Sequence, residues 1–194
     1  MALLVAGTAF DAHEVSLKDK PPEMLALSPK GSVPVMQLPD GNVLEQSWDI
    51  MRWALEPQAT KTWWVEAQAA ENLEWLASND GSFKHHLDRY KYPERHKESD
   101  PADHREQALA SFLRPLNSRL ALSKYLGGSR PCATDLAIFP FVRQFAAVEP
   151  AWFECEAMTA LQVWLENWLS SPLFMHCMYK LPSQMTVVFP SFEL

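Results

Sequence analysis

Hydrophobic and polar residues follow two different patterns along this chain. In the first 56 residues the apolar runs are short and are separated by turn-forming residues, which is typical of strands mixed with short helices. The predicted elements, in chain order, are helix 1–8, strand 10–17, helix 22–27, strand 33–38, strand 43–45 and helix 48–55. Beyond residue 60, apolar residues recur at every third or fourth position, as on one face of an amphipathic helix. We therefore predict an α/β domain over 1–56 and an all-helical domain over 60–194.

Turn and cap residues support these elements. The run Pro39-Asp40-Gly41-Asn42 predicts a hairpin turn, and Ser47 is expected to be the N-cap of the next helix. In the helical half, Asp100-Pro101 predicts a helix start, and Pro115 predicts a kink further along that helix. Cys132 is expected to cap a helix that begins at Ala133, with the Asp135 carboxylate reaching back to the cap.

Composition narrows the class of protein. The chain has 194 residues, 47% of them hydrophobic, which is enough to bury a core. The net charge of −7 argues against a general nucleic-acid-binding protein, since an acidic chain repels phosphate. No apolar stretch is long enough to span a membrane, and the apolar start lacks the basic region of a signal peptide. We therefore expect neither a nucleic-acid nor a membrane partner.

Cysteine usage indicates the compartment. Cys132, Cys155 and Cys177 are odd in number and have no CxxC spacing. This usage favours a reducing cytoplasm with free thiols over a disulfide framework. His85, His86, His96 and His104 lie close together in the sequence, but they lack HExxH or His-x-Cys spacing, so no metal is expected.

Two short motifs could bind a small acidic peptide. If the Val33-Pro34 bond is cis, the backbone of Val33 can offer its N–H and C=O to an extended ligand. Gln46 and Ser47 open a helix whose free N–H groups and positive dipole end suit a carboxylate. When the Val-Pro dipeptide is taken alone, an ordinary edge-strand proline is the stronger explanation of Pro34.

The combination resembles a known family. The run SPKGSVPVMQLPDGNVLEQSWDIMRWAL (residues 28–55) is similar to the N-terminal domain of cytosolic glutathione transferases. LKDKPPEM (residues 17–24) resembles the omega-like, cysteine-using branch, which is glutaredoxin-like, and RPCATDLAIFPF (residues 130–141) resembles the family's helical domain. The resemblance implies a thioredoxin-like α/β domain followed by a helical bundle, a homodimer and glutathione as co-substrate, without a metal.

The resemblance also implies roles for individual residues. Val33, with Pro34 cis, would hold the cysteinyl backbone of glutathione, and Gln46 and Ser47 would hold its γ-glutamyl carboxylate and amine. Lys20 would face the glycyl carboxylate, although a solvated turn lysine is an equal alternative. Tyr90 and Tyr92 would line an acceptor-substrate pocket, in a stretch that is otherwise typical of a solvated helix and loop.

The chain departs from the family's pattern at its start. Met1-Ala2-Leu3-Leu4 resembles the middle of the family's first helix, so the first strand and the catalytic loop are expected to be missing. No cysteine or tyrosine lies in residues 1–56, and we assign no catalytic residue. Two functions stay open. The first is glutathione-dependent conjugation or thiol–disulfide reduction of small electrophiles or disulfides in a full-length parent, with the activity impaired in this chain. The second is a non-catalytic binding or interaction module of the same fold.

Overall fold

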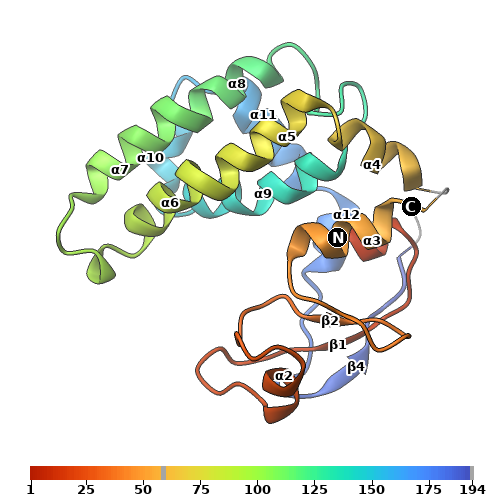
Figure 1. The fold of residues 1–194 in the computed structure, drawn as a ribbon. Coiled ribbons are helices and arrows are strands. Elements are labelled where there is room, and N and C mark those ends of the chain that lie inside the picture. Colours follow the sequence, from red (N-terminus) through yellow and green to blue (C-terminus); the bar gives the residue numbers. More distant parts are fainter. Residues whose placement is uncertain (58–59, 193–194) are drawn as a thin grey trace. The chain divides into compact units, whose positions relative to one another are not determined.

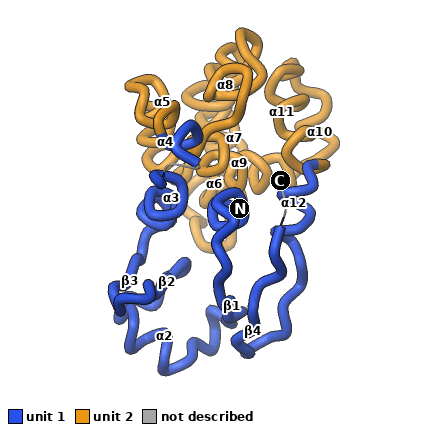
Figure 2. The backbone as a smooth tube through the Cα atoms, turned by 90° about the vertical axis from the view of Figure 1, so that its right-hand side faces the viewer, with its two compact units in different colours: residues 1–64, 171–194 blue, residues 65–170 orange. Residues whose placement is uncertain are grey.

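A computed structural model describes residues 1–57 and 60–192 of the chain. The described residues form two compact units: Met1–Trp64 together with Ser171–Leu194 (unit 1), and Val65–Ser170 (unit 2) (Figure 2). The boundary predicted near residues 56–60 includes 58 and 59, which lie outside the described residues. None of the described helices is both long and apolar enough to cross a membrane.

Unit 1 contains short helices and strands in mixed order (Figure 1). Its helices are α1 (Ala2–Val5), α2 (Pro22–Leu27), α3 (Ser47–Leu55), the start of α4 (Lys61–Ala67) and α12 (Pro172–Cys177). Its strands are β1 (Asp11–His13), β2 (Met36–Gln37), β3 (Val43–Leu44) and β4 (Thr186–Val188). The predicted α/β class is confirmed, and α2 has the predicted bounds because Pro21-Pro22 supplies a preset first turn.

The strands of unit 1 form two separate two-stranded ladders among the described residues. β2 and β3 pair across the predicted Pro39–Asn42 turn, with Met36 opposite Leu44. β1 pairs antiparallel with β4, with Ala12 opposite Val187. Both views of the fold show β1 between β2 and β4 (Figures 1 and 2).

The strand β4 corrects the prediction that residues 60–194 are all helical. The β-branched run Thr186-Val187-Val188 favours extended backbone, and its partner strand lies near the other end of the chain. The rings of Phe10 and Phe189 stack at 5.0 Å just beyond the ladder. The closing segment therefore belongs to unit 1, which the local sequence pattern could not show.

Unit 2 is helical, as predicted. Its helices are α5 (Ala70–Ser78), α6 (Lys84–Lys91), α7 (Pro101–Ala108), α8 (Arg114–Leu120), α9 (Ala133–Ala146), α10 (Pro150–Cys155) and α11 (Thr159–Leu169). A 3-10 turn, Pro93–Arg95, follows α6, and π-helical turns at Asn79–Phe83 and Leu109–Leu113 join α5 to α6 and α7 to α8. The second π-helical turn ends just before Pro115, so the predicted interruption precedes the proline. The single helix predicted over 62–78 is divided at Gln68-Ala69 into α4 and α5.

The core of unit 2 is built from the predicted apolar stripe. Leu109, Phe112, Leu113 and Leu116 are fully buried. The Phe83 and Phe112 rings stack with their centroids 4.3 Å apart, and both residues lie in π-helical turns. The wider turns thus bring these two aromatic rings face to face in the core.

Candidate functional site

The loop that leads into β2 presents unpaired backbone. The Val33–Pro34 peptide bond is cis, as predicted. Val33 is 48% exposed, and its backbone N–H and C=O have no hydrogen-bond partner among the described residues. The loop turns at Gly31, whose φ of +59° is a left-handed conformation that favours glycine. This segment therefore offers a free donor and a free acceptor to an extended ligand.

The start of α3 offers a second set of free groups. The side chains of Gln46 and Ser47 are exposed and make no hydrogen bond within the described residues. Gln46, and not Ser47 as predicted, occupies the N-cap position, with extended backbone at φ −121° and ψ 136° and no side-chain cap. Because α3 begins at Ser47, the Ser47 hydroxyl lies in the first turn, beside N–H groups that have no partner within the helix. The arrangement suits a carboxylate.

Glu45, which the sequence motifs do not single out, ties these two segments together. Its carboxylate accepts a hydrogen bond from the buried Ser28 hydroxyl at 2.5 Å and forms an ion pair with Lys30 at 3.3 Å. These two contacts hold the pKa of the Glu45 carboxyl below its usual value, the Ser28 bond being the larger cause. The loop before Val33 is thereby fixed to the residue that precedes Gln46. The only signal in the sequence is the position of Glu45 directly before Gln46-Ser47.

Lys20 lies over the loop that carries Val33. A Cβ atom placed on Gly31 would lie 3.2 Å from Lys20 Nζ, so the Lys20 side chain packs over the Gly31 backbone. Lys20 is half-buried and forms no ion pair within the described part of the chain. Its free ammonium group therefore lies over a residue only two positions before Val33. Together these groups supply a cation, a backbone donor and acceptor, and a helix start: the chemistry needed to bind a small peptide with carboxylates.

The two tyrosines of the expected acceptor pocket differ in environment. Tyr90 is only 5% exposed, packs against Phe145 and donates its hydroxyl to Glu149 at 2.7 Å. Burial, with the Glu149 bond second, raises the pKa of Tyr90 well above its usual value. Tyr92 is half-buried, with the Arg95 guanidinium 4.2 Å from its ring centre. Tyr90 thus serves the packing of unit 2, whereas the less buried Tyr92 ring is in contact with two cations, Arg95 and Lys91 at 4.9 Å.

Cys132 and Asp135 form the predicted helix cap. The Asp135 carboxylate accepts from the Cys132 N–H at 2.9 Å at the start of α9. It also accepts from the Leu126 N–H at 3.0 Å and from Trp164 Nε1 at 2.9 Å, and it is fully buried. Burial, followed by the Asp135 charge, raises the pKa of the Cys132 thiol to about 12, so this cysteine is not a nucleophile at neutral pH.

Family profiles match both parts of the chain. The family profile for the glutathione S-transferase N-terminal domain matches residues 1–56, and that for the C-terminal domain matches residues 64–167. The chain therefore belongs to the glutathione S-transferase family. No curated protein matches the sequence.

Solved glutathione S-transferase structures share the fold. The glutathione S-transferase from Xylella fastidiosa has a TM-score of 0.70 at 21% identity, covering 90% of this chain and 87% of its own. A family member from Pseudomonas fluorescens Pf-5, solved with two glutathione bound, has a TM-score of 0.70 at 19% identity, covering 90% and 83%. The protein from Xanthobacter autotrophicus Py2 has a TM-score of 0.63 at 22% identity, covering 88% and 85%.

Proposed function

We propose that residues 1–56 form a glutathione-binding domain. Val33 would pair with the cysteinyl backbone through its free N–H and C=O, while Gln46 and Ser47 would bind the γ-glutamyl carboxylate and amine. Lys20 would bind the glycyl carboxylate, since its ammonium lies over Gly31 on the loop that carries Val33. The proposal rests on two sets of polar groups that have no hydrogen-bond partner among the described residues, at Val33 and at the start of α3. Glu45 links the two segments that carry them.

The proposal includes the wider setting expected from the sequence. The chain would act in the cytoplasm as a homodimer of the omega-like branch, on small electrophiles or disulfides. The Lys-Pro segment ahead of α2 and the free thiols support the branch and the compartment. Unit 2, the helical unit over Val65–Ser170, would supply the acceptor side, with Tyr92 as the candidate wall of the acceptor pocket.

Calorimetric titration with glutathione tests the binding site. The Ser47→Ala variant should bind at least about tenfold more weakly, because it loses a hydrogen bond to a charged group. The matched control is Ser111→Ala, which removes an exposed helical hydroxyl in unit 2 that bonds only to the Gln107 carbonyl. Equal affinities for Ser47→Ala and the wild type would refute the assignment.

A non-catalytic binding module is the second candidate function. It is favoured by one observation: residues 1–56 hold neither a cysteine nor a tyrosine to activate the glutathione thiol. If this second function holds, conjugation of a model electrophile and reduction of a mixed disulfide by this chain run no faster than in buffer. Turnover that is lost in Ser47→Ala would instead identify the chain as an active transferase or reductase.

A further inference from the structure

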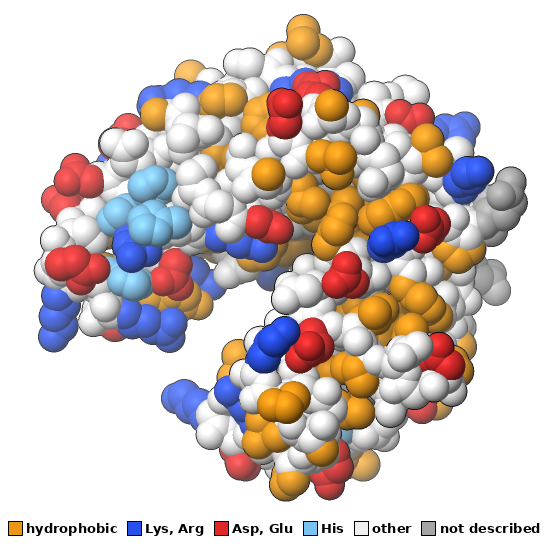
Figure 3. Space-filling view, in the orientation of Figure 1, with side chains coloured by type: hydrophobic (Ala, Val, Ile, Leu, Met, Phe, Trp, Pro, Cys, Tyr) orange, Lys and Arg blue, Asp and Glu red, His pale blue; other side chains and the backbone are white. Residues whose placement is uncertain are grey.

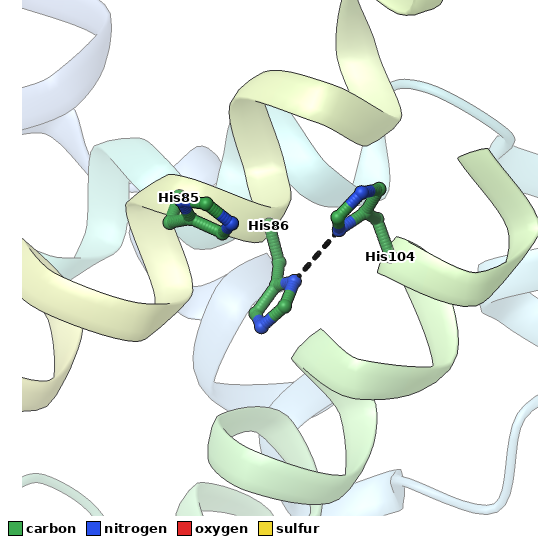
Figure 4. Close-up of side chains that lie close together, drawn as sticks. All are labelled: His85, His86 and His104. Atoms are coloured by element: carbon green, nitrogen blue, oxygen red, sulfur yellow. Dashed lines mark hydrogen bonds between the residues drawn. The ribbon is translucent and has the colours of Figure 1, made fainter. Parts of the chain in front are cut away.

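Three histidine side chains converge between α6 and α7. His85 and His86 lie on α6 and His104 lies on α7, and all three belong to unit 2 (Figure 4). Each residue offers one nitrogen, and the three nitrogens lie within 4.8 Å of one another. Their rings are mutually close, with centroid separations of 5.0 Å, 5.9 Å and 5.1 Å for the three pairs. Histidine side chains gather over these helices in the space-filling view (Figure 3).

We propose that His85, His86 and His104 form a binding site for a divalent late transition-metal ion, with zinc(II) and copper(II) as the expected occupants. Imidazole nitrogen is a preferred ligand for both ions. Bonds of about 2.0–2.1 Å to a tetrahedral zinc place ligand nitrogens about 3.4 Å apart. Side-chain rotations would bring the three nitrogens to this spacing, since the observed separations lie on both sides of it, from 2.8 Å for the His86–His104 pair up to 4.8 Å.

The hydrogen bond between His86 and His104 indicates how a metal ion would bind. His86 Nδ1 and His104 Nδ1 are 2.8 Å apart, so one ring donates its N–H to the lone pair of the other. Binding would replace this shared hydrogen with the metal ion, as the donor ring moves its proton from Nδ1 to Nε2. The pair is half-buried, whereas His85 is exposed, which leaves room for water as a fourth ligand.

The positive charge of Arg89 should weaken metal binding at the three histidines. Its Nη1 lies 3.1 Å from His85 Nδ1, one turn along α6, so a cation at the cluster would sit close to a guanidinium charge. The exposed carboxylate of Asp103, next to His104, offsets part of this charge. Arg89 should therefore lower the affinity of the site for a cation, and Arg89→Gln is a variant that should gain metal binding.

The test is a zinc(II) titration of the untagged chain, followed by calorimetry, in buffer free of glutathione and other chelators. A Cys155→Ser background removes the exposed thiol as a competing ligand. One zinc ion should bind per chain, and magnesium, which prefers oxygen ligands, should not compete. Because the experiment contains no glutathione, its result is independent of the site proposed in unit 1.

Variants assign the ligands. His85→Gln changes an exposed side chain and should weaken zinc binding by at least about tenfold, and His104→Gln by about 100-fold or more. Circular dichroism checks that each variant is folded. His13→Gln, which changes an exposed histidine of unit 1, should bind zinc as the parent does. Arg89→Gln should bind zinc severalfold more tightly.

Three results would contradict the metal site. The first is a folded parent chain that shows no saturable zinc binding. The second is zinc binding that persists unchanged in both His85→Gln and His104→Gln. The third is weaker binding in Arg89→Gln, because removing a positive charge beside the cluster should favour a bound cation.

Discussion

Units 1 and 2 are stabilised in different ways. Among the described residues, nearly all of the largest fully buried side chains belong to unit 2, including Trp164, Phe112 and Phe139, whereas Leu55 belongs to unit 1. Unit 1 instead relies on two short ladders and on polar links such as that from Ser28 to Glu45. The comparison indicates that the helical unit carries most of the hydrophobic stabilisation, while the α/β unit presents free polar groups for binding.

Phe112→Ala should be the most destabilising substitution in this comparison. It removes a fully buried ring that stacks on Phe83, so it leaves a cavity and should cost about 4 kcal/mol. The matched control is Phe10→Ala in unit 1, whose half-buried ring stacks on Phe189 and should cost about 1 kcal/mol. Urea unfolding of both variants measures the difference, and equal losses would contradict the contrast between the units.

Asp135→Ala should cost about 3 kcal/mol, because it leaves several buried donors without an acceptor. Loss of the helix cap alone should cost about 1–2 kcal/mol of unfolding free energy. Any larger loss measures the hydrogen bonds that Asp135 accepts from Leu126 and Trp164. Asp103→Ala, an exposed first-turn aspartate in α7, is the control and should change stability by less than about 0.5 kcal/mol. A loss below about 1 kcal/mol for Asp135→Ala would show that the network contributes little.

Trp164→Phe isolates one bond of this network. The phenyl ring keeps most of the packing but loses the indole N–H that donates to Asp135, which should cost about 1.5 kcal/mol. Trp75→Phe is the control, since the Trp75 indole nitrogen has no hydrogen bond among the described residues. A double-mutant cycle with Asp135→Ala should show coupling between the two side chains. Additive losses would contradict a direct interaction.

Acid should weaken unit 2 slightly through Glu149. Hydrogen bonds from Tyr90 and then from Arg105 lower the pKa of the Glu149 carboxyl in the folded state. Such a group stabilises the folded state above its unfolded pKa, and that stabilisation is lost as the pH falls through the folded pKa. Because the side chain is half exposed, the effect should be below about 1 kcal/mol. The urea unfolding midpoints of the wild type and of Glu149→Gln should therefore converge as the pH is lowered. A difference that stays constant with pH would show that the ionised Glu149 does not stabilise the folded state.

Several features of the fold could be predicted from local sequence alone. The bounds of α2, the hairpin turn before Val43 and the cap of α9 by Asp135 are all observed as expected. Each depends on residues only a few positions apart, whose backbone preferences and hydrogen bonds form within one turn. The cis bond at Val33–Pro34 is also observed. It is predicted by the surrounding peptide-binding motif, in which the Val33 backbone must face a ligand.

The candidate site could be predicted only in part. The motifs point to Val33 and the Gln46-Ser47 pair, and the family resemblance adds Lys20. The N-cap is Gln46, because the helical backbone of α3 already begins at Ser47. The position of Glu45 before Gln46-Ser47 does not reveal its partners, since Ser28 and Lys30 lie on the far side of the β2–β3 hairpin and only the folded loop brings them together.

Burial of Tyr90 likewise has no local signal. The residue lies in a polar, basic stretch, which is typical of a solvated helix. Its hydroxyl partner, Glu149, is distant in the sequence, and so is Phe145, which packs against its ring. The assignment of Tyr90 to the core of unit 2 therefore depends on how α6 packs.

Side-chain spacing and local backbone preference are enough to define the class of fold, the helical period of unit 2 and the motif at Val33 and Ser47. Three other features arise only when the chain folds: the pairing of β4 with β1, the link that Glu45 makes between two loops, and the meeting of His85, His86 and His104 between α6 and α7. Such contacts depend on how distant segments pack, and packing selects among many partners that are locally equivalent.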